Sequence, residues 1–191
     1  MSVVLDYLGE VGDLLKCIPD SEINKVVDLL YDAFKNDKRL LMFGNGGSGA
    51  TASHFANDFQ KGLYLYGGKP FKALSLADNL PIIMAWGNDT EYANIFEPQV
   101  ITWAEPGDVV LGISGSGNSE NVIRAINRAK SIGAHTVGLS GMGGGKLASS
   151  TDFCITVNSD NMQKIEDVHS VLLHCLYSVL RDRLAEELKK G

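Results

Sequence analysis

The stretch that constrains this chain most runs from residue 108 to residue 124, where an apolar run passes through a Gly/Ser loop into an amphipathic pattern. The apolar run, Val109–Ile113, is typical of a strand buried on both faces in a parallel sheet. Its loop combines glycines, which permit tight turns, with hydroxyl and amide side chains beside the free N–H groups of a helix expected to begin near Asn118. The loop residues are Ser114, Gly115, Ser116, Gly117, Asn118 and Ser119. Such a loop is either a cradle for a phosphate ester or an ordinary capped turn.

A second copy of the same plan lies earlier in the chain. The largely apolar run Arg39–Phe43 leads through a Gly-rich loop into a helical pattern at residues 48–60. The loop residues are Gly44, Asn45, Gly46, Gly47, Ser48 and Gly49. Two loops at the carboxyl ends of strands can face one ligand across a crevice of an open α/β sheet. Neither loop is a Walker A sequence or a dinucleotide fingerprint, so the pair favours a sugar phosphate over ATP or NAD.

The rest of the chain continues to alternate short apolar runs with amphipathic ones. Strands are expected at Arg39–Phe43, Phe71–Leu76, Asp108–Ile113, His135–Ser140 and Phe153–Val157. Helices are expected at residues 48–60, 80–86, 91–103, 118–132, 146–149 and 161–188. This alternation is typical of parallel sheets joined by right-handed crossovers. We therefore expect a three-layer α/β/α sandwich with a five-stranded parallel sheet, in a single domain over residues 1–191.

Two amphipathic patterns precede the first strand and form an N-terminal helical extension over residues 1–36. The first pattern ends before Pro19, and the second runs from Asp20 to Phe34. Helices at this point have no place inside a doubly wound sheet. They are expected either to contact neighbouring subunits or to cover one face of the sheet.

Charge and cysteine content exclude several classes of protein. The net charge is −6 and the basic residues are spread out, whereas electrostatic binding of nucleic acid needs clustered Lys and Arg. The three cysteines are isolated and lack the close pairs of zinc ribbons, which favours a reducing compartment. No basic leader precedes an apolar core at the amino end, and no apolar run approaches the ~18 residues that span a bilayer. We expect a soluble, cytoplasmic protein that binds neither nucleic acid nor membrane.

Two pairs of side chains could hold a metal. His54 and Asp58 are four residues apart, so both project from one face of the expected helix. Glu166 and His174 are eight apart on the last helix, a little over two turns, which also nearly aligns them. Two histidines and two carboxylates form a plausible tetrahedral zinc set, although each pair alone could make only a surface hydrogen bond. His169 is expected to pack inside the protein rather than to bind metal.

Several segments resemble the sugar isomerase (SIS) domain family, in its phosphoheptose isomerase branch. They are Phe-Gly-Asn-Gly-Gly-Ser at 43–48, His54-Phe55-Ala56, Gly87-Asn88-Asp89, Ile-Ser-Gly-Ser-Gly-Asn-Ser at 113–119, Gly144-Gly145-Lys146, and Ile165–His169 with His174. They span most of the chain in the family's order. The resemblance implies a flavodoxin-like, doubly wound fold, Zn²⁺ as cofactor and a homotetramer with sites between subunits.

The resemblance also implies an activity, the aldose–ketose isomerisation of sedoheptulose 7-phosphate to D-glycero-D-manno-heptose 7-phosphate in heptose and lipopolysaccharide biosynthesis. Asp58 and His174 would then be the base and acid. The implied zinc ligands are His54, Asp58, Glu166 and His174. The implied substrate contacts are Asn45, Gly46, Gly47, Ser48, Asp89, Ser114, Gly115, Ser116, Asn118, Ser119 and Glu166.

This chain departs from the family at three positions. Asp58 stands where Glu is usual, so its carboxylate should reach less far unless the backbone shifts, and Glu166 stands where Gln is usual and adds a negative charge. Gly115 replaces a common Thr and should leave the loop looser. These departures leave open an isomerase of another ketose or amino-sugar phosphate. A non-catalytic scaffold, like relatives that associate with the replication initiator protein, is a further alternative, although retention of all four candidate ligands favours an enzyme.

Overall fold

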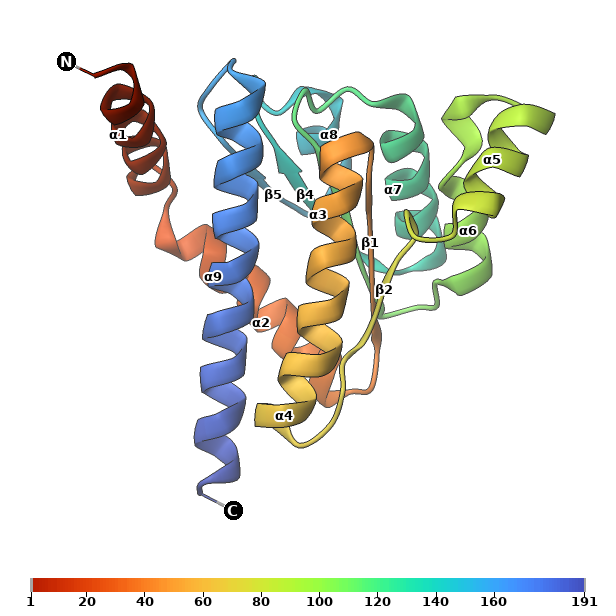
Figure 1. The fold of residues 1–191 in the computed structure, drawn as a ribbon. Coiled ribbons are helices and arrows are strands. Elements are labelled where there is room, and N and C mark those ends of the chain that lie inside the picture. Colours follow the sequence, from red (N-terminus) through yellow and green to blue (C-terminus); the bar gives the residue numbers. More distant parts are fainter. Residues whose placement is uncertain (1, 191) are drawn as a thin grey trace.

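The computed structural model describes residues 2–190 and forms a three-layer α/β/α sandwich (Figure 1). Its strands are β1 (Arg39–Gly44), β2 (Lys72–Ser75), β3 (Val109–Ser114), β4 (His135–Ser140) and β5 (Phe153–Thr156). They form one five-stranded sheet in the order β2-β1-β3-β4-β5, and every neighbouring pair is parallel. This is the strand order of flavodoxin-like folds. The predicted fold is therefore confirmed.

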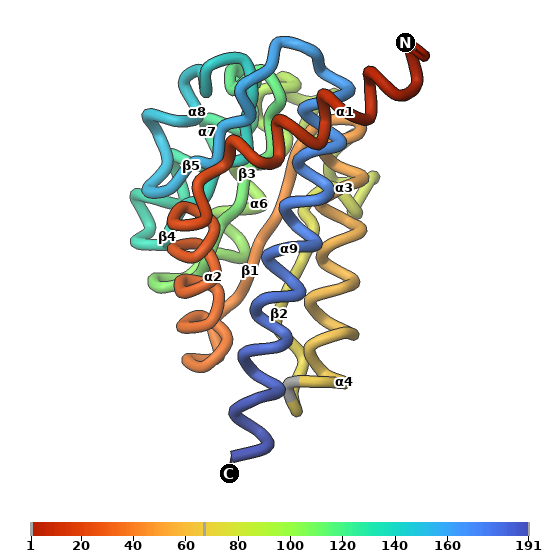
Figure 2. Tube along the Cα trace, turned by 90° about the vertical axis from the view of Figure 1, so that its left-hand side faces the viewer, coloured from red at the N-terminus to blue at the C-terminus, as the bar shows by residue number. Residues whose placement is uncertain are grey.

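Helices cover both faces of the sheet (Figures 1 and 2). The α-helices are α1 (Val3–Lys16), α2 (Asp20–Lys35), α3 (Gly46–Asn57), α4 (Leu63–Gly67), α5 (Leu80–Asp89), α6 (Glu97–Trp103), α7 (Glu120–Ile132), α8 (Gly145–Ser150) and α9 (Met162–Leu188). Because side chains alternate along a strand, Leu40 and Met42 join the core beneath α2, α3 and α9, while Leu41 and Phe43 join the opposite core beneath α6 and α7. None of the helices within residues 2–190 is long and apolar enough to cross a bilayer.

The two N-terminal helices have different environments. Helix α2 buries Val26, Leu30 and Phe34 in the core beneath the sheet, so it covers one sheet face. Helix α1 buries none of its residues and crosses the start of α9 (Figure 2), where the Tyr7 hydroxyl donates to the Asp167 carboxylate at 2.6 Å. The apolar residues that α1 leaves exposed include Val3, Val4, Leu5 and Leu8. Covering the sheet thus explains α2, whereas α1 contacts the core through Val11, Leu14 and Leu15 and leaves the apolar residues of its first turns exposed.

Several helices differ from their predicted bounds, most clearly those that follow β1 and β2. The helix after β1 continues through a π-helical turn at Asp58–Gly62 into α4, so it extends beyond residue 60. Helix α5 is not broken at Gly87 and runs to Asp89. The helix expected at 91–103 is split into a 3-10 turn at Tyr92–Asn94 and α6, because Pro98 lacks an N–H group and is accommodated only in the first turn of a new helix.

Candidate active site

Both Gly/Ser loops open from the same edge of the sheet. The strand register pairs Gly44, at the end of β1, with Ile113, near the end of β3, so the two loops start at almost the same level on adjacent strands. From β1 the chain crosses to β2 on one side, and from β3 it crosses to β4 on the other. The loops therefore flank the switch point of the sheet, where open α/β folds bind ligands.

The second loop directs hydroxyl groups into a compact turn. Ser114 is buried, and its Oγ lies 3.0 Å from Oγ of Ser119, which occupies the N-cap position of α7. The Ser116 Oγ accepts a hydrogen bond from the backbone N–H of Asn118 at 3.2 Å. Helix α7 begins at Glu120, two residues later than predicted, which leaves these serines in the loop ahead of the free N–H groups.

The Gly144–Lys146 segment packs against that loop. Gly117 has φ +66°, and a Cβ there would lie 2.1 Å from the Gly144 carbonyl oxygen, so only glycine fits. The backbone N–H of Leu147 donates to the Gly117 carbonyl at 2.9 Å, and that of Lys146 donates to Asn118 Oδ1 at 3.2 Å. The resemblance at residues 144–146 thus reflects packing of backbone against backbone.

The first loop is joined to the start of α7 by side-chain amides. Asn45 Nδ2 donates to Asn121 Oδ1 at 3.1 Å, and Asn121 Nδ2 donates back to Asn45 Oδ1 at 2.8 Å. The Tyr92 hydroxyl also donates to Asn45 Oδ1, at 3.1 Å. Ser48 is buried, while Gly46 and Gly47 are exposed. Neither Asn121 nor Tyr92 is among the predicted site residues, because an Asn in a first helical turn is typical of a cap and a single Tyr has no periodic pattern.

The first turns of α9 close over both loops. A Cβ at Gly115 would lie 2.4 Å from Met162 Sδ, and a Cβ at Gly47 would lie 3.1 Å from Glu166 Oε2. The expectation that Gly115 leaves the loop loose is therefore wrong, because Met162 fills the volume that a larger residue would occupy. The absence of a Cβ at Gly115 leaves room for the Met162 side chain.

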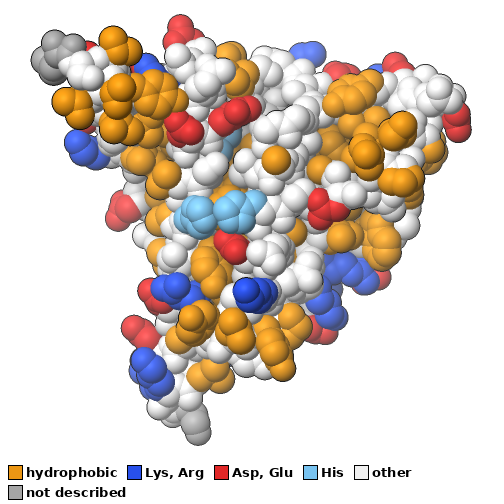
Figure 3. All heavy atoms as spheres, in the orientation of Figure 1, with side chains coloured by type: hydrophobic (Ala, Val, Ile, Leu, Met, Phe, Trp, Pro, Cys, Tyr) orange, Lys and Arg blue, Asp and Glu red, His pale blue; other side chains and the backbone are white. Residues whose placement is uncertain are grey.

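His54, Asp58 and His174 come together between α3 and α9. Asp58 Oδ2 lies 3.5 Å from His54 Nε2 and 3.8 Å from His174 Nε2, and one potential ligand atom from each residue falls within 4.8 Å of the others. The side chains of both histidines are 53% exposed and that of Asp58 is 26% exposed, so the group is open to a ligand. Figure 3 shows two histidine side chains side by side on this face.

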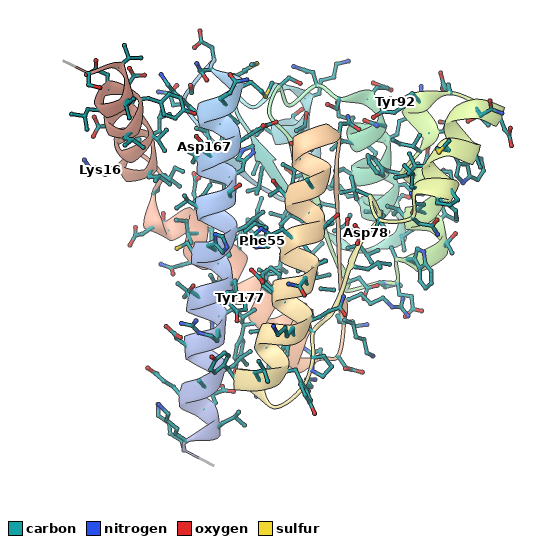
Figure 4. All side chains as sticks on the ribbon, viewed as in Figure 1. Lys16, Phe55, Asp78, Tyr92, Asp167 and Tyr177 are labelled. Atoms are coloured by element: carbon teal, nitrogen blue, oxygen red, sulfur yellow. The ribbon has the colours of Figure 1, made fainter. Side chains whose placement is uncertain are left out.

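Aromatic contacts orient the two imidazoles. Phe55 is buried between α3 and α9 (Figure 4), and its ring stacks on His54 with centroids 4.8 Å apart. The same ring meets His174 edge-on at 4.7 Å, and the two histidine rings are 5.2 Å apart. The backbone also changes here, since the π-helical turn begins at Asp58. Such π turns are frequent at functional sites.

Two predicted site residues lie outside both this group of three and the two loops. Glu166 and His174 share a helix face, but eight residues separate them by roughly 12 Å along the axis. Glu166 therefore lies beside Gly47 instead of beside His54 and Asp58. Asp89 ends α5, is exposed and accepts a hydrogen bond from Asn88 Nδ2 at 2.8 Å. Among the described contacts, no hydrogen bond joins Asp89 to either loop.

His169 has a structural environment. It is 1% exposed, and its Nε2 lies 3.1 Å from the Ser140 carbonyl oxygen, so the neutral ring carries its proton on Nε2. Its Nδ1 has no hydrogen-bond partner within residues 2–190. Burial lowers the pKa of His169 to about 4, partly offset by the bond to Ser140. The ring thus attaches α9 to the end of β4, in agreement with the expected packing role.

Two hollows lie beside the first loop and α3. The smaller, of about 290 Å³, is lined by Asn45, Gly46, Ser53, Tyr92 and neighbours. The larger, of about 510 Å³, lies on a face of α3 about 100° from His54 and Asp58. Its polar lining residues are Ser53, Asn57, Gln60, Lys61, Tyr64 and Asp78. The candidate catalytic group itself lies on the open surface between α3 and α9.

The sheet order and the two loops at its switch point define a doubly wound α/β protein, and known proteins resemble this chain in sequence and in structure. The SIS domain family matches residues 6–141. Phosphoheptose isomerase from Geotalea daltonii is 40% identical over 87% of this chain and 86% of its own. Phosphoheptose isomerase from Aquifex aeolicus is 38% identical over 86% of each chain. The structure of phosphoheptose isomerase GmhA from Neisseria gonorrhoeae aligns with a TM-score of 0.85 and 30% identity, over 93% of this chain and 96% of that one. The chain therefore belongs to the SIS domain family, in its phosphoheptose isomerase branch.

Proposed function

We propose that this protein is a sugar-phosphate isomerase that converts sedoheptulose 7-phosphate to D-glycero-D-manno-heptose 7-phosphate. The observation that carries the proposal is the meeting of His54, Asp58 and His174 on one open surface, because these are an acid, a base and a potential metal site in one place. Similarity to phosphoheptose isomerases over most of the chain supports the same substrate.

The arrangement of α3 and α9 suits a long substrate. The two helices run side by side, with Gly47 and Glu166 together at one end and the histidine group further along (Figures 1 and 2). Eight residues separate Gly46 from His54, a rise of roughly 12 Å along α3. A heptose 7-phosphate carries its phosphate and its reacting carbons at opposite ends of the molecule. It can place the phosphate at the serine loop while C1 and C2 approach Asp58 and His174.

The chemistry needs one base and one acid. In the ketose-to-aldose direction, the base removes a proton from C1, the electrons of that C–H bond form a C1–C2 double bond, and the C2 carbonyl oxygen takes a proton from the acid. The resulting enediol then receives a proton at C2 while the C1 hydroxyl gives up its proton, which leaves the C1 aldehyde. We assign these transfers to Asp58 and His174, whose shared position lets a proton pass between them.

We also propose that zinc is held by His54, Asp58 and His174. Imidazole and carboxylate atoms are typical zinc ligands, and the three donors already lie within 4.8 Å of one another, so the residues fit the metal. When bound, zinc would supply Lewis acidity that polarises the carbonyl and hydroxyl oxygens. The role proposed for Glu166 changes with its position, from metal ligand to a contact with the sugar near the first loop.

We further propose a homotetramer in the cytoplasm. The exposed apolar residues of α1 and α5 would be covered by other copies of the chain, since contiguous apolar surface of this kind marks interaction sites. They are Val3, Val4, Leu5, Leu8, Leu80, Ile82, Met84 and Trp86. The three cysteines are free thiols, which suits a reducing compartment. Light scattering at micromolar concentration tests the assembly, and a monomeric mass would contradict it.

The activity is tested by incubating the protein with sedoheptulose 7-phosphate in D₂O, with and without added zinc. We expect the aldose to form and to carry deuterium at C2, because the enediol takes its proton from exchanging groups. Turnover of another ketose or amino-sugar phosphate in its place would transfer the proposal to that substrate. Absence of turnover with all of these sugars, with zinc present, would contradict an isomerase and favour the scaffold alternative.

A further inference from the structure

We infer that Asn121 is a positioning residue that holds the two Gly/Ser loops at the separation needed to bind phosphate. The kinetic part of this inference rests on the proposed isomerase activity. Asn121 touches neither the serine hydroxyls nor the histidine group among the described contacts. It acts through Asn45, to which it is joined by two reciprocal amide hydrogen bonds of 3.1 and 2.8 Å.

The amide pair lies where the two loops leave the sheet. Asn45 directly follows β1 and precedes α3, whereas Asn121 lies in the first turn of α7, just after the serine loop. Strands β1 and β3 are adjacent, with Gly44 in register with Ile113. The pair therefore joins the two loops across the switch point of the sheet, where the backbone hydrogen bonds between the strands have ended.

The hydrogen-bond groups of the pair admit one favourable arrangement. Asn121 is 2% exposed, and its Oδ1 accepts from both Asn45 Nδ2 and the backbone N–H of Val122, the latter at 2.9 Å. Asn45 Oδ1 accepts from Asn121 Nδ2 and from the Tyr92 hydroxyl. Rotation of either amide would set oxygen against oxygen in a buried place, where an unmade hydrogen bond is costly because water cannot replace the lost partner. The loops are thus held in one relative position before any ligand arrives.

A fixed loop separation should affect ligand binding more than the chemical step. The phosphate is remote from the carbons that react, so its contacts are equally strong in the ground state and the transition state. Loss of such uniform binding raises KM and leaves kcat unchanged. We expect Asn121→Ala to raise KM for sedoheptulose 7-phosphate about tenfold with kcat within about twofold of the parent, in the usual range for coupled neighbours.

The double-mutant cycle with Asn45 separates positioning from direct contact. Asn45→Ala removes the partner through which Asn121 acts, together with any contact that Asn45 makes to the sugar. We expect Asn121→Ala to add less than about twofold to KM in the Asn45→Ala background. Tyr92→Phe provides an exposed substitution that removes only the third hydrogen bond, and it should raise KM in the parent and have no effect in the Asn45→Ala background.

The matched control is Thr136→Val. Thr136 is as buried as Asn121, and its hydroxyl makes two hydrogen bonds of 2.9 Å to Asp152, at the amino end of β4 and away from both loops. It should lower the melting temperature as Asn121→Ala does and leave KM unchanged. If Thr136→Val raises KM equally, or if the Asn45 and Asn121 effects multiply, Asn121 is only a stabilising residue and the inference is overturned.

Binding of inorganic phosphate tests the inference separately from the activity. Calorimetry should show the same weakening in Asn121→Ala, and the same lack of a further effect in the double variant, whether or not the protein isomerises a sugar. Failure of the parent to isomerise sedoheptulose 7-phosphate would contradict the proposed function alone. Unchanged phosphate affinity in both Asn121→Ala and Tyr92→Phe would contradict the positioning role alone.

Discussion

The carboxylate of Asp58 and the imidazole of His174 face each other across α3 and α9, with Oδ2 3.8 Å from Nε2. The same carboxylate oxygen lies 3.5 Å from Nε2 of His54. One carboxylate oxygen thus lies close to both imidazoles, and this shared neighbour makes the three side chains a single functional group. Changes at any one of them should alter the behaviour of the others.

His174→Gln should lower kcat by roughly 10²–10⁴-fold, the range contributed by general acid–base catalysis. Gln keeps the size and polarity of the side chain but cannot exchange a proton at neutral pH. Steady-state kinetics with the sugar phosphate measures the effect, and circular dichroism checks that the fold is retained. Asp58→Glu is the conservative comparison and should keep activity, because it preserves the carboxylate. Parent-like turnover in His174→Gln would remove His174 from the mechanism.

Zinc content should depend on the same three residues. We expect the purified protein to bind zinc, to lose it in His54→Ala, and to release it as the pH falls, because protonated ligands cannot coordinate metal. Chelator competition followed by elemental analysis measures the affinity. His135→Ala is the control, since His135 is an exposed histidine at the start of β4 and outside the group. Equal zinc loss in both variants would mean that binding is adventitious.

The double variant Ser116→Ala/Ser119→Ala should bind sugar phosphate more weakly and remain folded. Each hydroxyl bond to a charged phosphate is worth on the order of 1.5–3 kcal/mol. Both hydroxyls are half-buried in the loop, so their loss leaves the core unchanged. Calorimetry measures the affinity, with Ser131→Ala as a control for loss of an exposed hydroxyl at the far end of α7. Unchanged affinity would make the loop an ordinary turn.

Gly115→Thr should destabilise the protein even though Thr is common in the family at this position. The added Cβ would lie 2.4 Å from Met162 Sδ, so the flexible Met162 side chain must move aside, and we expect a cost of about 1 kcal/mol, at the low end for overpacking. Met162→Ala should restore part of the lost stability, because it removes the side chain atoms that the added threonine would meet. Urea unfolding of the two single variants and the double variant measures the coupling. Additive losses would show that Met162 and Gly115 do not compete for space.

His169 should make the protein less stable as the pH falls from about 6.5 to about 4. Its pKa in the folded protein is about 4, below the ordinary 6.5, because burial disfavours the charged ring. Within this window the unfolded chain binds a proton that the folded protein does not, so the free energy of unfolding falls by about 3 kcal/mol at its lower end. Above pH 6.5 the contribution is complete and constant.

The variant His169→Gln isolates that contribution. Gln can donate to the Ser140 carbonyl but does not titrate, so its unfolding free energy should fall less steeply between pH 6.5 and pH 4 than that of the parent. Urea unfolding at a series of pH values measures both slopes. Parallel curves for parent and variant would show that His169 does not sense pH.

Local sequence determined the strands, the two loops and the pairing of His54 with Asp58. A short, β-branched apolar run bounded by turn residues, such as Val109–Ile113, favours a buried strand, and residues four apart on a helix share a face. The parallel sheet followed from the alternation of strands and helices, and the flavodoxin-like fold followed from the family resemblance. These features depend on neighbours in the sequence, so the sequence was sufficient to predict them.

Only the tertiary structure decided which distant residues meet. Eight residues already place Glu166 roughly 12 Å from His174 along α9, but only the packing of α9 against α3 put Glu166 beside Gly47 and His174 beside Asp58. The contact of Met162 with Gly115 and the amide pair of Asn45 with Asn121 depend on how α9 and α7 pack on the sheet. Such contacts are fixed by the summed packing of the whole core, and no segment of the chain encodes them by itself.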